Sequence, residues 1–444
     1  MRTLYKYFIP AALLFLFANA ATSQSSNTRD TLSLTLEQCI ERALEANYSV
    51  IISDNDLQIA RNNVTLAPFL PYVTLGSKQS VNRLEQRNYS SEGIKESSNS
   101  NSSSILNNAN MSWKLFDGLS MFATRDKQTE LLAQGEYNFR SVVENLVMQI
   151  STQYYLIISL KNQVNLLTEL VSISQIRYNQ ALTRFNIGSS SGLEYKQAKI
   201  YLNSDSSKLL LQKENLKNAY IELFQLMNLP LDSKNSINDT IIAEPVLDVE
   251  KLISLAKDNN TSLAALRAGE RIAKLDTKIA KASRYPSLEL SAGYSYNFNQ
   301  SQFFSSRYNE SNGLNWGFSL SIPVFDRNEI NRKVKNARIS EENANLGYLK
   351  AKQELESELY QLYNVYTNNL RLIGFEEENR AAAYLNLDAA LEKYKLGSLS
   401  GIEFRDIQLS YLDASDRRLN AIYQAKISEI TLHLLAGELF RKLQ

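Results

Sequence analysis

Two long stretches without proline most constrain the fold of this 444-residue chain. None of its 7 prolines lies between residues 72 and 229 or after residue 323, and proline is the residue that most strongly breaks a helix interior. Within both stretches apolar residues recur every three or four positions, and leucine recurs every seven from Leu202 to Leu223. These periods predict continuous amphipathic helices at about 119–187 and 329–396. At about 1.5 Å per residue, each would be a rod of roughly 100 Å.

Between the helical stretches, apolar residues alternate with polar ones, which is typical of β-strands. The clearest pair of strands covers residues 288–298 and 314–322, and a weaker pair covers residues 72–81 and 108–115. Each strand is about ten residues long, with one apolar and one polar face, as in a transmembrane β-strand. The polar, low-complexity segment 82–104 and its shorter counterpart in the second pair are predicted to be solvent-exposed loops.

The chain also contains an internal repeat. The segment "LEQCIERALEANYSV" resembles "VEKLISLAKDNNTSL", "LFDG" resembles "VFDR", and "RFNIGSSSGLEY" resembles "KYKLGSLSGIEF", the last two pairs being 209 residues apart. We therefore predict a first structural repeat at 24–231, a linker at 232–248 and a second repeat at 249–444. Each repeat should consist of a helix, two strands and two long helices.

The N-terminus has the pattern of a secretory signal peptide, which we place at residues 1–23. Arg2 and Lys6 precede a short apolar run, and Ala18-Asn19-Ala20 forms a cleavage signature. No later stretch is apolar for the roughly 18 residues that a transmembrane helix needs. The formal net charge of +1 gives no electrostatic reason to expect a nucleic-acid partner.

Four strands with a lipid-compatible face cannot close a β-barrel alone, because known single-chain barrels begin at eight strands. An open sheet edge in hydrocarbon would leave costly unpaired backbone groups. The strands are therefore expected to be pooled between two or three copies of the chain. The long helices, emerging from one side of such a barrel, would extend it as a tube.

In their order and duplication, these motifs resemble the TolC-type outer-membrane efflux proteins. The resemblance covers essentially the whole mature chain and includes "LPYVTL" and "YPSLEL" at the strand starts. It implies a homotrimer with a twelve-stranded β-barrel in the bacterial outer membrane and a long α-helical barrel in the periplasm. It also implies a passive duct that contacts outer-membrane lipid and docks onto a periplasmic adaptor (membrane fusion) protein bound to an inner-membrane pump of the RND or ABC type. No enzyme activity, cofactor or metal is expected.

The resemblance also implies functions for the duplicated turns, which would be the periplasmic helix tips. Glycine commonly ends a helix and serine commonly begins one. Residues expected to dock the adaptor are Gly188, Ser191, Gly192, Glu194, Gly397, Ser400 and Gly401.

Glu403 and Asp406 match two acidic positions that constrict the pore in this family. In a trimer they would place six carboxylates around the pore and favour cations there. The first of these positions is Glu here, whereas the family pattern has Asp. Arg405, between them, has no family role that can be transferred. A purely structural alternative is that Glu194 and Glu403 complement the dipole of the helix that follows each turn.

Aromatic residues in the strands are expected to form a band at the membrane interface, although ordinary strand packing is an alternative. These residues are Trp113, Trp316, Tyr294 and Tyr296.

Alternative functions fit the sequence less well. Gly188 to Gly192 matches the G-x-S-x-G motif of serine hydrolases, but this motif requires a strand before Ser190 and a base nearby. The single histidine, His433, lies in a helical pattern, and the single cysteine, Cys39, is expected to be a buried helix residue. A secreted or periplasmic coiled-coil scaffold or adhesin without a pore would explain the rods but not the four strands. An autonomous porin is a third possibility.

Overall fold

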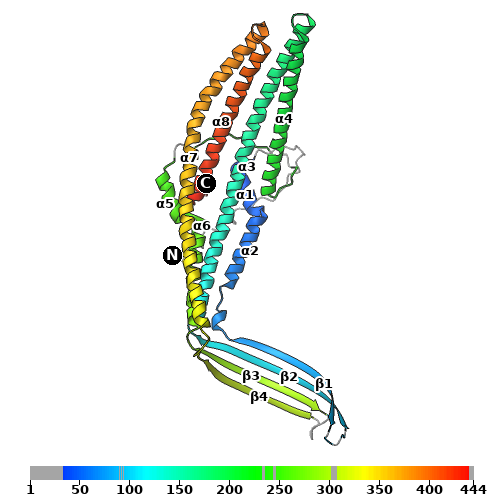
Figure 1. The fold of residues 1–444 in the computed structure, drawn as a ribbon, viewed down its shortest axis with the longest axis vertical. Helices are drawn as coiled ribbons and strands as arrows, with labels where there is room; N and C mark the ends of the chain where they lie inside the picture. Colours follow the sequence, from blue (N-terminus) through cyan, green and yellow to red (C-terminus); the bar gives the residue numbers. More distant parts are fainter. Residues whose placement is uncertain are drawn as a thin grey trace, which may run out of the picture.

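The computed structural model describes residues 34–439 except 90, 92, 94, 233–235, 244–246 and 302–307, so the expected signal peptide lies outside the described residues. A four-stranded sheet forms one end of the molecule, and two long helical hairpins form the other (Figure 1). The first half contains α1 (Leu36–Ala46), α2 (Tyr48–Asn63), η1 (Ala67–Phe69), β1 (Tyr72–Tyr89), β2 (Lys95–Asp117), α3 (Ser120–Asn186) and α4 (Gly192–Leu226). The second contains α5 (Val249–Asn259), α6 (Thr261–Ala282), β3 (Ser287–Ser301), β4 (Tyr308–Ser321), α7 (Glu329–Leu396) and α8 (Gly401–Leu435).

The two rods, α3 and α7, are continuous helices of 67 and 68 residues, as the periodicity predicts. Each begins after the aspartate of the repeated "FD" pair. The Oδ1 atom of Asp117 accepts a hydrogen bond from the backbone N–H of Met121 at 3.1 Å, and the Oδ2 atom of Asp326 accepts one from Ile330 at 2.5 Å. Both aspartates thus satisfy N–H groups that a helix start leaves unpaired.

Each half opens with two helices, whereas the sequence predicted one. Asn47 ends α1 and begins α2, and Asn260 ends α5 and begins α6. Both have an extended backbone, and their side chains accept hydrogen bonds from the first turn of the next helix. An asparagine in this conformation is a favoured N-cap, so it divides the helical pattern without a proline or glycine.

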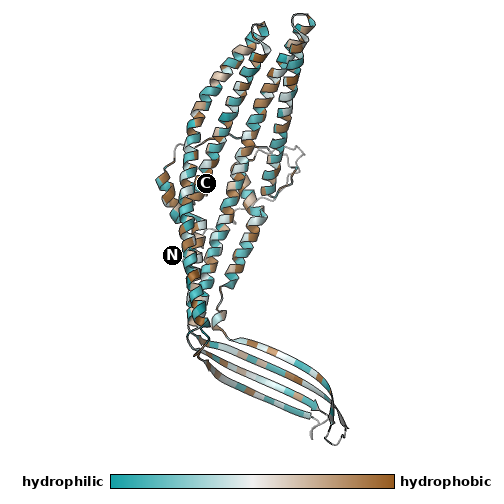
Figure 2. Cartoon of the chain, viewed as in Figure 1, coloured by the Kyte–Doolittle hydropathy of each residue, from teal (hydrophilic) through white to brown (hydrophobic). Residues whose placement is uncertain are grey.

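The strands form one antiparallel sheet in the order β1-β2-β3-β4. Apolar residues align in rows across all four strands, for example Leu75, Ala109, Tyr294 and Leu314. The opposite face consists of rows such as Gly76, Asn108, Ser295 and Gly313. Hydropathy alternates along the strands (Figure 2). Because side chains alternate between the faces of a strand, this register gives the sheet one apolar and one polar face.

The prediction of an exposed loop at residues 82–104 is wrong for most of that segment. β1 and β2 continue through it, with Arg83 opposite Asn101 and Tyr89 opposite Lys95. The composition is unsuited to a buried core, but a hairpin pairs its backbone groups whatever its side chains are. The sheet therefore extends beyond its apolar band as a polar β-ribbon.

The helical part has its core between α1, α3 and α4 and a corresponding core between α5, α7 and α8. Cys39 is fully buried in the first core, as predicted, and burial raises the pKa of its thiol to about 11. At that pKa the thiol stays protonated at neutral pH and is unreactive. Across the described parts of the chain, no helix combines the length and apolar character needed to cross a membrane.

Candidate functional site at the helix tips

The two duplicated turns close the hairpins α3–α4 and α7–α8 at the end farthest from the sheet (Figure 1). Gly188 and Gly397 have φ angles of 76° and 81°, which favour glycine. After each, a serine N–H reaches back to the helix: Ser189 donates to the Arg184 carbonyl at 2.9 Å, and Ser398 donates to the Lys393 carbonyl at 3.0 Å. Both turns are Schellman motifs, as is common where glycine ends a helix.

This geometry excludes the hydrolase interpretation of Ser190. The residue follows a 67-residue helix instead of a strand. His433 lies near the C-terminal end of α8, whereas the α3–α4 turn lies at the same end of the molecule as the N-terminal end of α8 (Figure 1). At about 1.5 Å per residue, roughly 45 Å of helix separates the two residues.

The two serine caps differ. The Oγ atom of Ser400 accepts a hydrogen bond from the backbone N–H of Glu403 at 3.2 Å, whereas Ser191 makes no side-chain cap bond. Glu194 and Glu403 both lie in the first turn of the helix that follows.

Replacing Ser400 by Ala is expected to lower the stability of the second tip by about 1 kcal/mol, the usual effect of losing an N-cap. The matched Ser191→Ala variant should change stability by a few tenths of a kcal/mol at most, because its side chain caps nothing. Hydrogen exchange of the first-turn amides of α8 and α4 would measure both effects. Equal destabilisation of the two tips would contradict the conclusion that Ser400 caps its helix and Ser191 does not.

Arg184 joins the two tips. Its guanidinium lies 4.9 Å from the centre of the Tyr394 ring and donates a hydrogen bond to the Tyr394 carbonyl. It also lies 3.6 Å from the carboxylate of Glu194, which accepts a hydrogen bond from the Tyr394 hydroxyl at 3.3 Å. Burial raises the pKa of Tyr394. The predicted docking residue Glu194 therefore binds residues of both hairpins.

Below the tips, Arg405 forms a buried ion pair that the sequence analysis missed. Its Nη1 and Nη2 atoms lie 2.7 and 2.8 Å from the two carboxylate oxygens of Asp205 on α4. Ser174 of α3 donates to the same carboxylate at 2.6 Å, and Gln408 donates to Ser174 at 2.9 Å. Arg405 is 6% exposed and Asp205 is fully buried. The network therefore links α3, α4 and α8.

A sequence signal for this network existed. Asp205 lies three residues after Leu202, where the heptad pattern of α4 calls for an apolar residue. A charged residue on such a stripe indicates a buried partner.

A second arginine, Arg177 of α3, is 3% exposed and stacks 4.9 Å from the centre of the Tyr201 ring. Its Nε and Nη1 atoms have no hydrogen-bond partner among the described residues, and burial lowers the pKa of its guanidinium. A Cβ atom at Gly401 would lie 3.1 Å from its Nη2 atom. A larger residue at position 401 would therefore require the Arg177 guanidinium to shift by a few tenths of an ångström.

Glu403 and Asp406 lie on the exposed side of α8, one turn apart. Phe404 and Arg405, which lie between them in the sequence, point into the protein and are buried. No ion pair or hydrogen bond to either carboxylate is found within the described residues. Both acids are therefore available to face a pore or a partner.

The tips also carry exposed apolar side chains that the sequence analysis did not select. They occupy equivalent positions in the two repeats and are between 70% and 83% exposed. These residues are Ile187 and its equivalent Leu396, and Leu193 and its equivalent Ile402.

The four strand aromatics selected from the sequence share the apolar face of the sheet. Trp316 lies opposite Ala292, one row from Tyr294, and is 70% exposed. Trp113 is half-buried, and its indole N–H donates to the Phe69 carbonyl of η1 at 3.0 Å. Trp113 therefore also fixes the sheet to the segment that precedes it.

Comparison with known proteins identifies the family. The chain matches the model of the outer membrane efflux proteins over residues 39–229 and 252–438. It belongs to this family. It is 22% identical to the outer membrane protein TolC of Vibrio cholerae, over 96% of this chain and 95% of that protein. It is 23% identical to the cation efflux system protein CusC of Escherichia coli K12, over 74% of this chain and 72% of that protein.

Solved structures agree on the fold. The outer membrane protein VceC of Vibrio cholerae superposes with a TM-score of 0.73 at 18% identity, over 90% of this chain and 96% of that one. The predicted family and the combination of helical rods with four strands are thus confirmed. The chain is an outer-membrane efflux protein, and nothing in the comparisons supports the scaffold alternative.

Proposed function

We propose that three copies of the chain form the passive exit duct of a tripartite efflux or secretion system. The observation that carries this proposal is the four-stranded sheet with one apolar face and two edge strands, β1 and β4. In hydrocarbon each edge must pair with another strand. Three copies would join these edges into a twelve-stranded barrel, with the polar face lining the lumen.

In this arrangement the hairpins continue the lumen across the periplasm. The repeat boundaries at 24–231 and 249–444 belong to the proposal, since each repeat would supply one strand pair and one hairpin. The sequence has no G-x-x-x-x-G-K-[ST] phosphate loop, so the energy would come from an inner-membrane pump of the RND or ABC type. The chain itself would catalyse no reaction.

We propose that Glu403 and Asp406 form the periplasmic gate, and that the tip turns dock the adaptor. Both side chains are exposed, and neither has an ion-pair or hydrogen-bond partner for its carboxylate among the described residues, which supports the gate role. The duplicated apolar residues, including Leu193 and Ile402, support docking, because exposed apolar clusters commonly mark protein interaction sites.

Fractionation of cells that produce the tagged full-length chain would test this function. We expect unboiled samples from the outer membrane to contain a trimer band, and we expect the adaptor to co-purify with it. The double variant Leu193→Asp and Ile402→Asp should keep the trimer and lose the adaptor. Leu75→Asp, in the lipid-facing row of β1, should instead lose the outer-membrane trimer. Recovery of the wild-type chain as a soluble periplasmic protein would overturn the proposal.

A further inference from the structure

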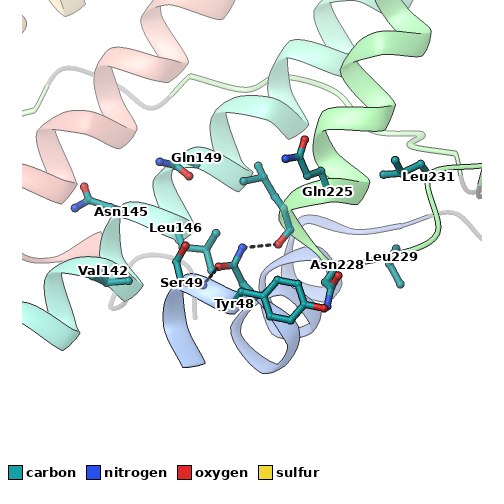
Figure 3. A pocket seen from close by; sticks show the side chains of 12 residues that line it. Tyr48, Ser49, Val142, Asn145, Leu146, Gln149, Gln225, Asn228, Leu229 and Leu231 are labelled. Atoms are coloured by element: carbon teal, nitrogen blue, oxygen red, sulfur yellow. Dashed lines mark hydrogen bonds between the residues drawn. The ribbon is translucent and has the colours of Figure 1, made fainter. Parts of the chain in front are cut away.

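The helical part and the sheet each contain a hollow large enough for a small molecule. The hollow in the helical part, of about 650 Å³, lies where α1, α2 and the end of α4 meet on α3 (Figure 3). Its Asn47 is already bonded: the side-chain amide donates to the Leu226 carbonyl at 2.9 Å, and the Oδ1 atom accepts from the backbone N–H of Ser49 at 2.8 Å. A ligand there would compete with bonds that hold the helix junction together.

The hollow on the sheet, of about 430 Å³, lies on the polar face. Eight of the eleven residues that line it belong to two rows that cross all four strands. These rows are Tyr72–Ser112–Ser291–Gly317 and Thr74–Asn110–Gly293–Asn315. The adjoining row on the opposite face contains Leu75, Tyr294 and Leu314. The hollow therefore lies at the level of the apolar band, and in the proposed barrel it would open into the lumen within the membrane.

Glycine residues form the floor of this hollow. Gly293 is buried, because the side chains of Asn110 and Asn315 lean over it from the two neighbouring strands. A Cβ atom at Gly293 would lie 2.9 Å from the Oδ1 atom of Asn110 and 2.6 Å from that of Asn315. Gly317 has open space where its Cβ atom would lie. The two missing side chains leave a depression beside a pair of amides.

The polar groups around the depression are available to a ligand. Asn110 and Asn315 are both exposed, and no hydrogen bond to either side-chain amide is found among the described residues. Each amide offers two N–H donors and one carbonyl acceptor. Tyr72, at the edge of the hollow, is 72% exposed and adds an aromatic ring. None of the described residues that line the hollow is charged.

We propose that this hollow binds a neutral, polyhydroxylated ligand, namely an oligosaccharide. Sugar hydroxyls both donate and accept hydrogen bonds, which matches the two amides. The apolar face of a sugar ring can pack on the Tyr72 ring, since tyrosine combines an apolar body with a polar tip. An ion would fit poorly, because the uncharged lining could not compensate for the lost hydration. The inference rests on the proposed barrel only for the position of the site in the lumen.

Equilibrium binding of maltohexaose to the purified full-length protein tests the proposal. Isothermal titration calorimetry in a detergent without a sugar head group would measure it. The wild type should bind saturably and with the same affinity at low and high salt, because no charge takes part. The absence of saturable binding, or binding that is lost at high salt, would overturn the site.

Two glycines of β4 provide a matched pair of variants. Gly317 and Gly313 lie on the same face and both have open space at the Cβ position, but only Gly317 lines the hollow. Gly317→Val should weaken binding by about tenfold or more, because the valine occupies the depression. Gly313→Val should leave the affinity unchanged. An equal effect of the two variants, or no effect of Gly317→Val, would contradict the proposed site.

A substitution at an exposed wall residue gives a second test that does not change the sheet floor. Asn315→Leu should weaken binding by about tenfold, because it removes the hydrogen bonds of one amide. Asn309→Leu is the control, since Asn309 lies on the same strand and face but outside the hollow. The control should bind maltohexaose as the wild type does. Unchanged binding in Asn315→Leu would overturn the role of the amide pair.

The results also separate this site from the proposed duct. A trimeric wild-type protein that does not bind maltohexaose would overturn the site alone. A monomeric wild-type protein would overturn the proposed duct. Binding measured on that monomer would still decide the site, because a single chain supplies every residue that lines the hollow.

Discussion

Replacing Arg405 by Ala is expected to destabilise the region below the helix tips by about 3–5 kcal/mol, the usual effect of removing one partner of a buried ion pair. The variant leaves the fully buried carboxylate of Asp205 with Ser174 as its remaining hydrogen-bond donor. Hydrogen exchange of the backbone amides of α4 and α8 in this region should accelerate roughly 100- to 4000-fold. The amides of α1, in the distant core, should be unaffected.

Two further variants distinguish the effect of breaking the buried pair from the general effect of removing a charge. Arg417→Ala removes an arginine of the same helix that pairs with Glu376 but is itself 54% exposed, and ion pairs open to solvent contribute about 1 kcal/mol or less. The double variant Arg405→Met and Asp205→Leu removes both charges and should recover much of the lost stability, since apolar replacement of a whole buried pair is often neutral. Similar exchange rates in Arg405→Ala and Arg417→Ala would contradict the burial argument.

Neutralising the gate with Glu403→Gln and Asp406→Asn is expected to lower the cation-over-anion permeability ratio by about tenfold, which corresponds to about 1.4 kcal/mol. Both side chains are exposed and unpaired within the described residues, so the change removes charge without disturbing packing. In a trimer it removes six carboxylates from one constriction, and charged rings determine ion selectivity in pores. Reversal potentials under a salt gradient would measure the ratio.

Glu214→Gln provides the matched control, because Glu214 is exposed on α4 and outside the tip. Its reversal potential should equal that of the wild type. A selectivity that does not respond to the two gate substitutions, or that responds equally to the control, would show that the gate acids lie away from the pore.

The sequence predicts the long helices closely because their signal is local and repeated many times. The predicted ends of α3 and α7 agree with the structure within one residue. The glycine turns were also predictable, since Gly188 and Gly397 need a backbone conformation that few other residues adopt. The prediction of the opening helices was less accurate, because in each half a single asparagine cap divides the helical segment in two without interrupting the apolar pattern.

The buried network and the exposed tip residues depend on contacts between distant segments. Arg405 and Asp205 are 200 residues apart, and their pairing requires the packing of α8 on α4 and α3. Ile187 and Leu193 look like ordinary core positions in the helical pattern, and only the folded chain shows that they are exposed. Periodicity predicts which residues form the apolar face of a helix, but it does not specify which other segment covers that face.

Single-channel recording of the purified full-length trimer in planar bilayers tests the central proposal most directly. A gated duct should give small, stable conductance steps in the wild type, and these steps should grow several-fold in the Glu403→Gln and Asp406→Asn variant. Large open steps in the wild type that the gate substitutions leave unchanged would contradict a gated exit duct and indicate an open pore.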